Sequence, residues 1–141
     1  LPKGRSEEGD KIHKDQKNSM QSEHVQSKVR EAVDLCYRMK DQLLRGHLKI
    51  FGESLDTAWK LKRQFSNKIT NSKIDEVYDY AIKSGALGGK LLGAGGGGYF
   101  LFYVEPLKKY SFIKKMHKRN MSPTKFSFES SGLRSWSTRI E

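Results

Sequence analysis

The sequence predicts an α+β domain in which helices cover one face of a four-stranded antiparallel sheet. Through residues 23–84, apolar side chains recur at three- and four-residue steps, which is the spacing of amphipathic helices. After residue 85 the pattern changes to short strand-like runs, joined closely enough for hairpins. The expected order from residue 23 is α-α-α-β-β-α-β-β, and strands that are few and linked as hairpins favour the α+β class.

Composition and charge narrow the classes of protein to consider. The 141 residues suit one domain. Lys and Arg number 27 against 16 Asp and Glu, for a formal net charge of +11, which favours an anionic partner: a nucleic acid, a membrane surface or a phosphorylated small molecule. No apolar run approaches the roughly 20 residues that cross a bilayer. Cys36 is alone, so it makes neither an internal disulfide nor a cysteine-rich zinc site. We therefore expect a cytoplasmic protein without membrane contact.

Residues 1–22 are expected to form a polar arm or a marginal helix, and residues 23–141 the folded domain. Ser6 is a suitable helix cap, but Gly9 inside such a helix costs about 1 kcal/mol relative to alanine. The chain opens at Leu1 rather than at a methionine, so we expect a fragment or a processed piece of a longer protein.

Two amphipathic helices are predicted next, over about 23–45 and 48–65. Gly46 is well placed to end the first, and the short turn predicts an antiparallel helix hairpin. The apolar stripe of the first helix is Val25, Val29, Ala32, Val33, Cys36, Met39 and Leu43. The stripe of the second is Phe51, Leu55, Ala58, Trp59 and Phe65. On this pattern Cys36 is a small core residue and Trp59 a packing residue.

A third helix is predicted between Ser72 and Gly85. The spacing of Ser72 and Asp75 is that of an N-terminal capping box, with Asp in place of the usual Glu or Gln. Gly85 then ends the helix. A glycine-weakened strand is expected over 86–92, followed by a loop over 93–98.

The apolar run from Tyr99 to Val104 predicts a central strand buried on at least one face. Pro106 suits the first turn of a fourth helix, over about 106–119. The alternating segments 125–130 and 133–140 then predict a hairpin that completes the sheet, and Trp136 is expected to pack there.

The glycine-rich loop is the most informative segment for function. Its residues are Gly93, Ala94, Gly95, Gly96, Gly97 and Gly98. Glycine permits positive φ and carries no Cβ, so backbone N–H groups can converge on an anion. The loop is not a Walker A motif, because Lys90 precedes the glycines and no Ser or Thr follows. It is not a Rossmann fingerprint either, because a strand follows where a helix should begin.

The segment from Lys90 to Gly98, between a helix that ends at Gly85 and an aromatic strand, resembles the third conserved motif of GHMP kinases. These are small-molecule kinases that act on galactose, homoserine, mevalonate and phosphomevalonate. The run 88–93 and the preceding helices most resemble the branch that phosphorylates D-glycero-D-manno-heptose 7-phosphate. The resemblance extends over about residues 28–140.

The resemblance implies that this chain is the C-terminal half of a two-domain, ATP- and Mg²⁺-dependent sugar kinase. The family's N-terminal domain carries a Pro-x-x-x-Gly-Leu-Gly-Ser-Ser loop around the ATP phosphates, and that pattern is absent from these residues. By analogy, Gly93–Gly98 would support the triphosphate and Lys90 would face anionic substrate oxygens. The resemblance assigns no catalytic residue and no metal ligand to this chain, which is therefore expected to be inactive alone.

Other interpretations of the same residues stay open at this stage. The loop can be a packing point without a ligand, and Lys90 can be a solvated lysine at a strand end. A basic α+β domain with aromatic strands also suits RNA binding, although the RNA-recognition pattern is absent. A non-catalytic interaction domain is a further alternative. An apolar surface left uncovered by a missing half would favour self-association.

Overall fold

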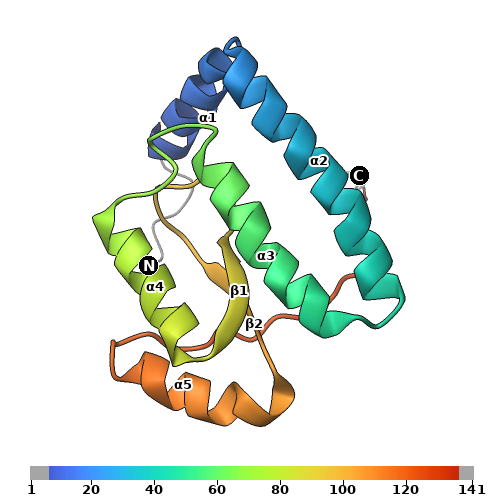
Figure 1. The fold of residues 1–141 in the computed structure, drawn as a ribbon, viewed down its shortest axis with the longest axis vertical. Helices are drawn as coiled ribbons and strands as arrows, with labels where there is room; N and C mark the ends of the chain where they lie inside the picture. Colours follow the sequence, from blue (N-terminus) through green and yellow to red (C-terminus); the bar gives the residue numbers. More distant parts are fainter. Residues whose placement is uncertain (1–6, 137–141) are drawn as a thin grey trace, which may run out of the picture.

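The computed structural model describes residues 7–136 as an assembly of helices around a short antiparallel sheet (Figure 1). Its elements are α1 (Glu7–Ser19), α2 (Glu23–Leu44), α3 (Leu48–Arg63), α4 (Ser72–Ser84), β1 (Ala86–Leu91), β2 (Phe100–Val104), the 3₁₀ turn η1 (Pro106–Lys108) and α5 (Lys109–His117). The α+β class and the helices predicted from the apolar spacing are confirmed. The stretch expected to be an arm or a marginal helix contains α1.

Helices α2 and α4 end near glycines, as predicted, but the residue that caps the start of α4 differs from the prediction. Gly46, which follows the C-cap residue Arg45 of α2, has a φ of 73°, and Gly85, directly after α4, has a φ of 120°. At the start of α4, however, the capping residue is Asn71 rather than Ser72, because the Asn71 side chain accepts the N–H of Ile74 at 3.0 Å. Asp75 contacts Thr70 and Arg63 instead of closing a capping box.

Helix α3 lies at the centre of the fold, between α2 on one side and the sheet on the other (Figure 1). Between α2 and α3 the buried cluster is Leu35, Met39, Leu55 and Leu61. On the sheet side, Trp59 has no exposed surface and packs with Tyr78 and Leu91. The aromatic rings of Phe100 and Phe102 from β2 also pack against this cluster.

Strand β1 packs directly on the backbone of α3, and glycines make that approach possible. A Cβ on Gly88 would lie 2.1 Å from the carbonyl oxygen of Gly52 and 2.6 Å from the amide nitrogen of Asp56. A Cβ on Gly52 would in turn lie 2.3 Å from the ring of Tyr103. These glycines therefore set how closely the strand and the helix meet.

The described residues form a two-stranded sheet, so the expectation of four strands is wrong over residues 7–136. Strands β1 and β2 pair antiparallel, with Leu91 opposite Phe100 and Ala86 opposite Val104, and with a bulge between Ala86 and Gly88. Each strand consequently has one unpaired edge. Strand β2 is half-buried along its length, and in the two-stranded sheet of residues 7–136 it is an edge strand rather than the predicted central one.

The expected C-terminal hairpin does not form within the described residues, and its part beyond residue 136 lies outside them. After α5 the chain is an extended coil that runs toward the side of α2 and α3 in Figure 1. Phe128 is 94% exposed and Trp136 is 84% exposed, so Trp136 is not a packing residue. Alternation alone does not stabilise a hairpin, because its apolar face needs a surface to cover it.

The predicted apolar stripe of α2 is only partly buried. Val25, Leu35 and Met39 are buried, whereas Cys36 is exposed and is not a core residue. Helix α2 packs mainly on α3, and this single contact covers a narrow face of the helix. Among the described helices, none is long and apolar enough to cross a membrane.

Candidate functional site

The glycine-rich loop connects β1 to β2 and has an unusual backbone. Gly93, Gly95, Gly96 and Gly98 have φ angles of 79°, 120°, 72° and 111°. Side chains with a Cβ rarely adopt this region, so glycine is required at these four positions for conformational reasons.

The middle of the loop packs on the turn after α3. The N–H of Gly96 donates to the carbonyl oxygen of Ile69 at 2.9 Å. A Cβ on Gly95 would lie 2.8 Å from both the Cα and the carbonyl oxygen of Ile69. The loop is therefore held against the protein rather than extending freely into solvent.

Helix α1 also contacts the loop. The side-chain amide of Gln16 donates to the carbonyl oxygen of Ala94 at 3.0 Å, and the buried Ile12 lies over Gly96. Asp15 fastens the same helix to the turn after α3, since Lys68 donates to its carboxylate at 2.7 Å. The hydrogen bond from Lys68, and then the one from Ser66, lower the pKa of Asp15. The polar N-terminal segment is thus part of the surroundings of the loop.

Several amide groups of the loop are not used by the fold. Within the part of the chain that the structure describes, the N–H groups of Gly93, Ala94, Gly95 and Gly97 donate to no protein acceptor. A Cβ at Gly93 or Gly97 would meet nothing within 4 Å, so these two positions border open space. A loop with free N–H groups beside open space can accept an anion.

Two lysines lie at the β1 end of the loop. Lys90 is in β1 and is half-buried. Lys62 reaches the same place from α3, and its Nζ donates to the carbonyl oxygens of Leu91, at 3.3 Å, and of Gly93. Burial, and then the positive charge of Lys90, lower the pKa of Lys62 to about 8. The two ammonium groups are therefore close enough to repel each other, and an anion beside them would offset that repulsion.

Sequence reasoning selected Lys90 and the loop as a candidate site, and it did not anticipate that Lys62 and Gln16 contact this loop. A signal for Lys62 was present, because it follows Leu55 and Trp59 at helical spacing and so continues the buried stripe of α3. A lysine at such a position must find polar partners in the interior. Gln16 gave no comparable signal, because it belongs to a polar segment.

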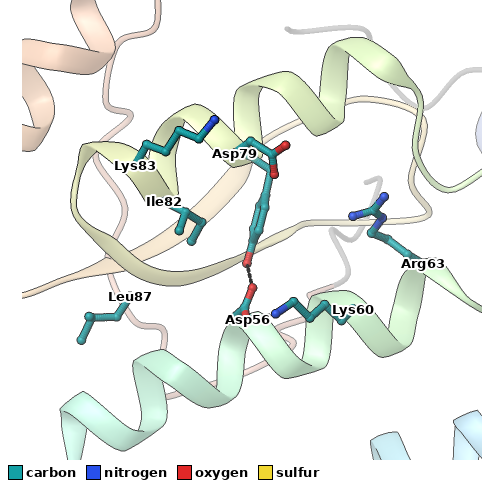
Figure 2. Close-up of a pocket in the computed structure, with 8 residues that line it drawn as sticks. Asp56, Lys60, Arg63, Asp79, Ile82, Lys83 and Leu87 are labelled. Carbon is teal, nitrogen blue, oxygen red and sulfur yellow. Dashed lines mark hydrogen bonds and ion pairs between the residues drawn. The ribbon is translucent and has the colours of Figure 1, made fainter.

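A separate hollow of about 390 Å³ lies between α3 and α4 (Figure 2). Tyr78 lines it and donates to Asp56 at 2.7 Å, and Lys60 pairs with the same carboxylate at 2.6 Å. Burial, and then the hydrogen bond with Asp56, raise the pKa of Tyr78, so its phenol stays protonated. These groups satisfy one another and connect the two helices. No residue of the glycine-rich loop lines this hollow.

No group of three or more His, Cys, Asp or Glu side chains within residues 7–136 could hold a metal ion. The described residues therefore do not fit a complete magnesium site, and we derive no chemical step through one.

We expect the stability of the fold to rise between about pH 8 and pH 10. In this range Lys62 loses its proton in the folded state but keeps it when unfolded, because its pKa is lowered from 10.5 to about 8. The unfolded state then binds more protons, and stability increases with pH. Above about pH 10, Tyr78 acts in the opposite direction, since its pKa is raised by folding. Urea unfolding at pH 7, 8, 9 and 10 measures the rise, which should shrink in Lys62→Met. An equal rise in both proteins would contradict this assignment.

Comparison with known proteins identifies the family. Residues 39–121 match the family model described as GHMP kinases C terminal. This match covers more than half of the chain and includes the glycine-rich loop. The chain belongs to the GHMP kinase family.

This GHMP kinase domain is similar in sequence to one known kinase and similar in fold to another. It is 36% identical over 99 residues to a D-glycero-alpha-D-manno-heptose 7-phosphate kinase of Campylobacter jejuni, covering 70% of this chain and 29% of the relative. Its fold is similar to the crystal structure of L. major mevalonate kinase in complex with R-mevalonate, with a TM-score of 0.66 and 19% identity, covering 84% of this chain and 36% of that one. The chain thus spans about a third of the length of these proteins.

Proposed function

We propose that this chain is the C-terminal part of an ATP-dependent kinase for a phosphorylated sugar, and that its substrate is a heptose 7-phosphate. The observation that carries the proposal is the glycine-rich loop, whose free amides lie beside Lys62 and Lys90. The heptose kinase relative supports the choice of substrate class. The phosphate-binding loop and the catalytic groups would come from an N-terminal domain.

Phosphoryl transfer depends mainly on positioning and on neutralising the charge of the phosphate oxygens. ATP supplies the phosphoryl group when bound. Within this chain, the loop amides can donate to phosphate oxygens, and the charge of Lys90 favours an anionic substrate nearby. The packing on Ile69 and α1 keeps these donors in place before the substrate arrives.

The test is an ATP-dependent phosphorylation assay of the full-length protein with D-glycero-D-manno-heptose 7-phosphate. We expect turnover by the full-length protein and none by residues 1–141 alone. Lys90→Met should raise the KM for the sugar phosphate about tenfold with a smaller change in kcat, since a charged hydrogen bond contributes about 1.5–3 kcal/mol. Lys83→Met is the matched control, because Lys83 lies on the α3–α4 hollow (Figure 2). Turnover of unphosphorylated sugars only would contradict the proposed substrate class.

RNA binding through the strand aromatics has less support. The rings of Phe100 and Phe102 stack on each other with centroids 5.1 Å apart, and Phe100 also packs edge-on against Trp59. Rings engaged in the core in this way do not offer a platform for bases.

We also propose that the isolated chain self-associates through α2. Val33, Tyr37 and Leu44 recur at helical spacing and are 48%, 67% and 74% exposed. Water in contact with this face is released when a second surface covers it. Sedimentation velocity of residues 1–141 should show a concentration-dependent increase in mass, which Tyr37→Ser combined with Leu44→Ser should reduce. A monomer at all concentrations would contradict this expectation.

A further inference from the structure

We propose that Lys62 is a positioning residue for the glycine-rich loop: its ammonium group holds the backbone of Leu91 and Gly93 in the conformation that receives an anion. The inference deepens the proposed function and rests on it. It assigns a role to a residue of α3, which lies far from the glycine-rich motif in sequence.

The contacts of Lys62 are at the point where β1 becomes the loop. Its Nζ donates to the carbonyl oxygens of Leu91, at 3.3 Å, and of Gly93, and so spans the intervening residue. The N–H of that residue, Leu92, donates to the carbonyl oxygen of Tyr99 at 2.9 Å. Residues 91–93 are thereby fixed from two sides, by the helix and by the start of β2.

Two further hydrogen bonds hold the middle of the loop. Gln16 bonds to Ala94, and Gly96 bonds to Ile69. Within the described residues, Lys62 is the side chain that hydrogen-bonds the backbone of Gly93, whose amide is the first of the free N–H groups. Loss of Lys62 therefore removes one of the two supports of the β1 end of the loop and leaves the bond between Leu92 and Tyr99, while the middle stays attached.

The charge of Lys62 also has an electrostatic cost in the absence of an anion. Lys62 is half-buried beside Lys90, so burial and like charge both disfavour its protonated form. A residue needed only to fill space would avoid this cost, as a methionine of similar length does. The arrangement is favourable when an anion lies at the loop, because the anion interacts with both lysines.

The experiment is amide hydrogen exchange of the full-length protein without ligand. We expect the amide of Leu92, which donates to Tyr99 between the two carbonyls held by Lys62, to exchange at least tenfold faster in Lys62→Met than in the wild type, while the amides of α2 and α3 keep their protection. Lys62→Arg should restore slow exchange, because a guanidinium also donates to two carbonyl oxygens. Lys90→Met is the matched control: it removes the neighbouring charge without touching the carbonyl contacts, and its loop should exchange as in the wild type.

Unchanged exchange of the Leu92 amide in Lys62→Met would overturn the inference, as would equal acceleration in Lys90→Met. If Lys62→Met does not fold, Lys62→Gln provides the same comparison, because its shorter side chain does not span the distance to both carbonyls. In the kinase assay, Lys62→Met should lower kcat about tenfold, with partial rescue by Lys62→Arg. If the wild-type protein has no kinase activity, the proposed function fails while the exchange result still decides the role of Lys62.

Discussion

Replacing Gly88 with alanine is expected to lower the free energy of unfolding by about 3 kcal/mol, at the upper end of the usual cost of overpacking. The added Cβ would lie 2.1 Å from the carbonyl oxygen of Gly52 and 2.6 Å from the amide nitrogen of Asp56. Both are backbone atoms of α3, so no side-chain rotation relieves the clash. The strand must move away from the helix, which opens the cluster around Trp59. Urea unfolding measures the loss, and the midpoint of thermal unfolding should fall by about 10 °C.

Gly97→Ala is the control for this prediction. Gly97 has no neighbour within 4 Å of a built Cβ, and its φ is not positive. Its replacement should change the free energy of unfolding by less than about 0.5 kcal/mol. If Gly88→Ala is as stable as Gly97→Ala, the close packing of β1 on α3 is not present in the protein.

On the proposed kinase function, replacing Gly95 with alanine is expected to reduce kcat/KM of the full-length protein about 100-fold, the effect of misplacing substrate contacts by about 1 Å. Gly95 has a φ of 120°, and its added Cβ would lie 2.8 Å from the Cα and the carbonyl oxygen of Ile69. The substituted loop must therefore leave both its backbone conformation and its packing surface. Steady-state kinetics with ATP and the sugar phosphate measure the effect.

Gly9→Ala is the control in this experiment. It adds the same methyl group in α1, where a built Cβ meets nothing within 4 Å, and should keep most of the activity. Global stability should fall less in Gly95→Ala than in Gly88→Ala, because the loop lies at the edge of the fold rather than between α3 and β1. Wild-type kinetics in Gly95→Ala would show that the loop does not position the substrate.

The helices could be predicted because local signals and tertiary contacts agree there. Gly46 and Gly85 end helices by positive φ, a property of the residue itself. The apolar spacing of α3 was a good guide to its buried residues because α3 is covered on two sides, by α2 and by β1. In α2 the same spacing predicted more buried residues than the structure contains. Helix α3 covers only one face of α2, and Cys36 remains exposed.

The sequence indicates the glycine-rich loop as a candidate site, but it does not indicate the residues that hold the loop in place. Runs of glycine before an aromatic strand are visible in the sequence, whereas the contacts of Gln16 and Lys62 join residues 78 and 31 positions apart. Such contacts depend on how α1 and α3 pack, which no local pattern contains. The failed hairpin has the same cause: Phe126 and Phe128 alternate correctly, but whether a strand forms depends on what covers them.

The position of α1 has a mechanical consequence. This helix has 13 residues and is therefore a rod about 20 Å long; Ile12 in its middle and Gln16 near its C-terminal end touch the glycine-rich loop. A displacement of α1 would consequently reach Ala94 and Gly96 through these two side chains, without passing through the sheet.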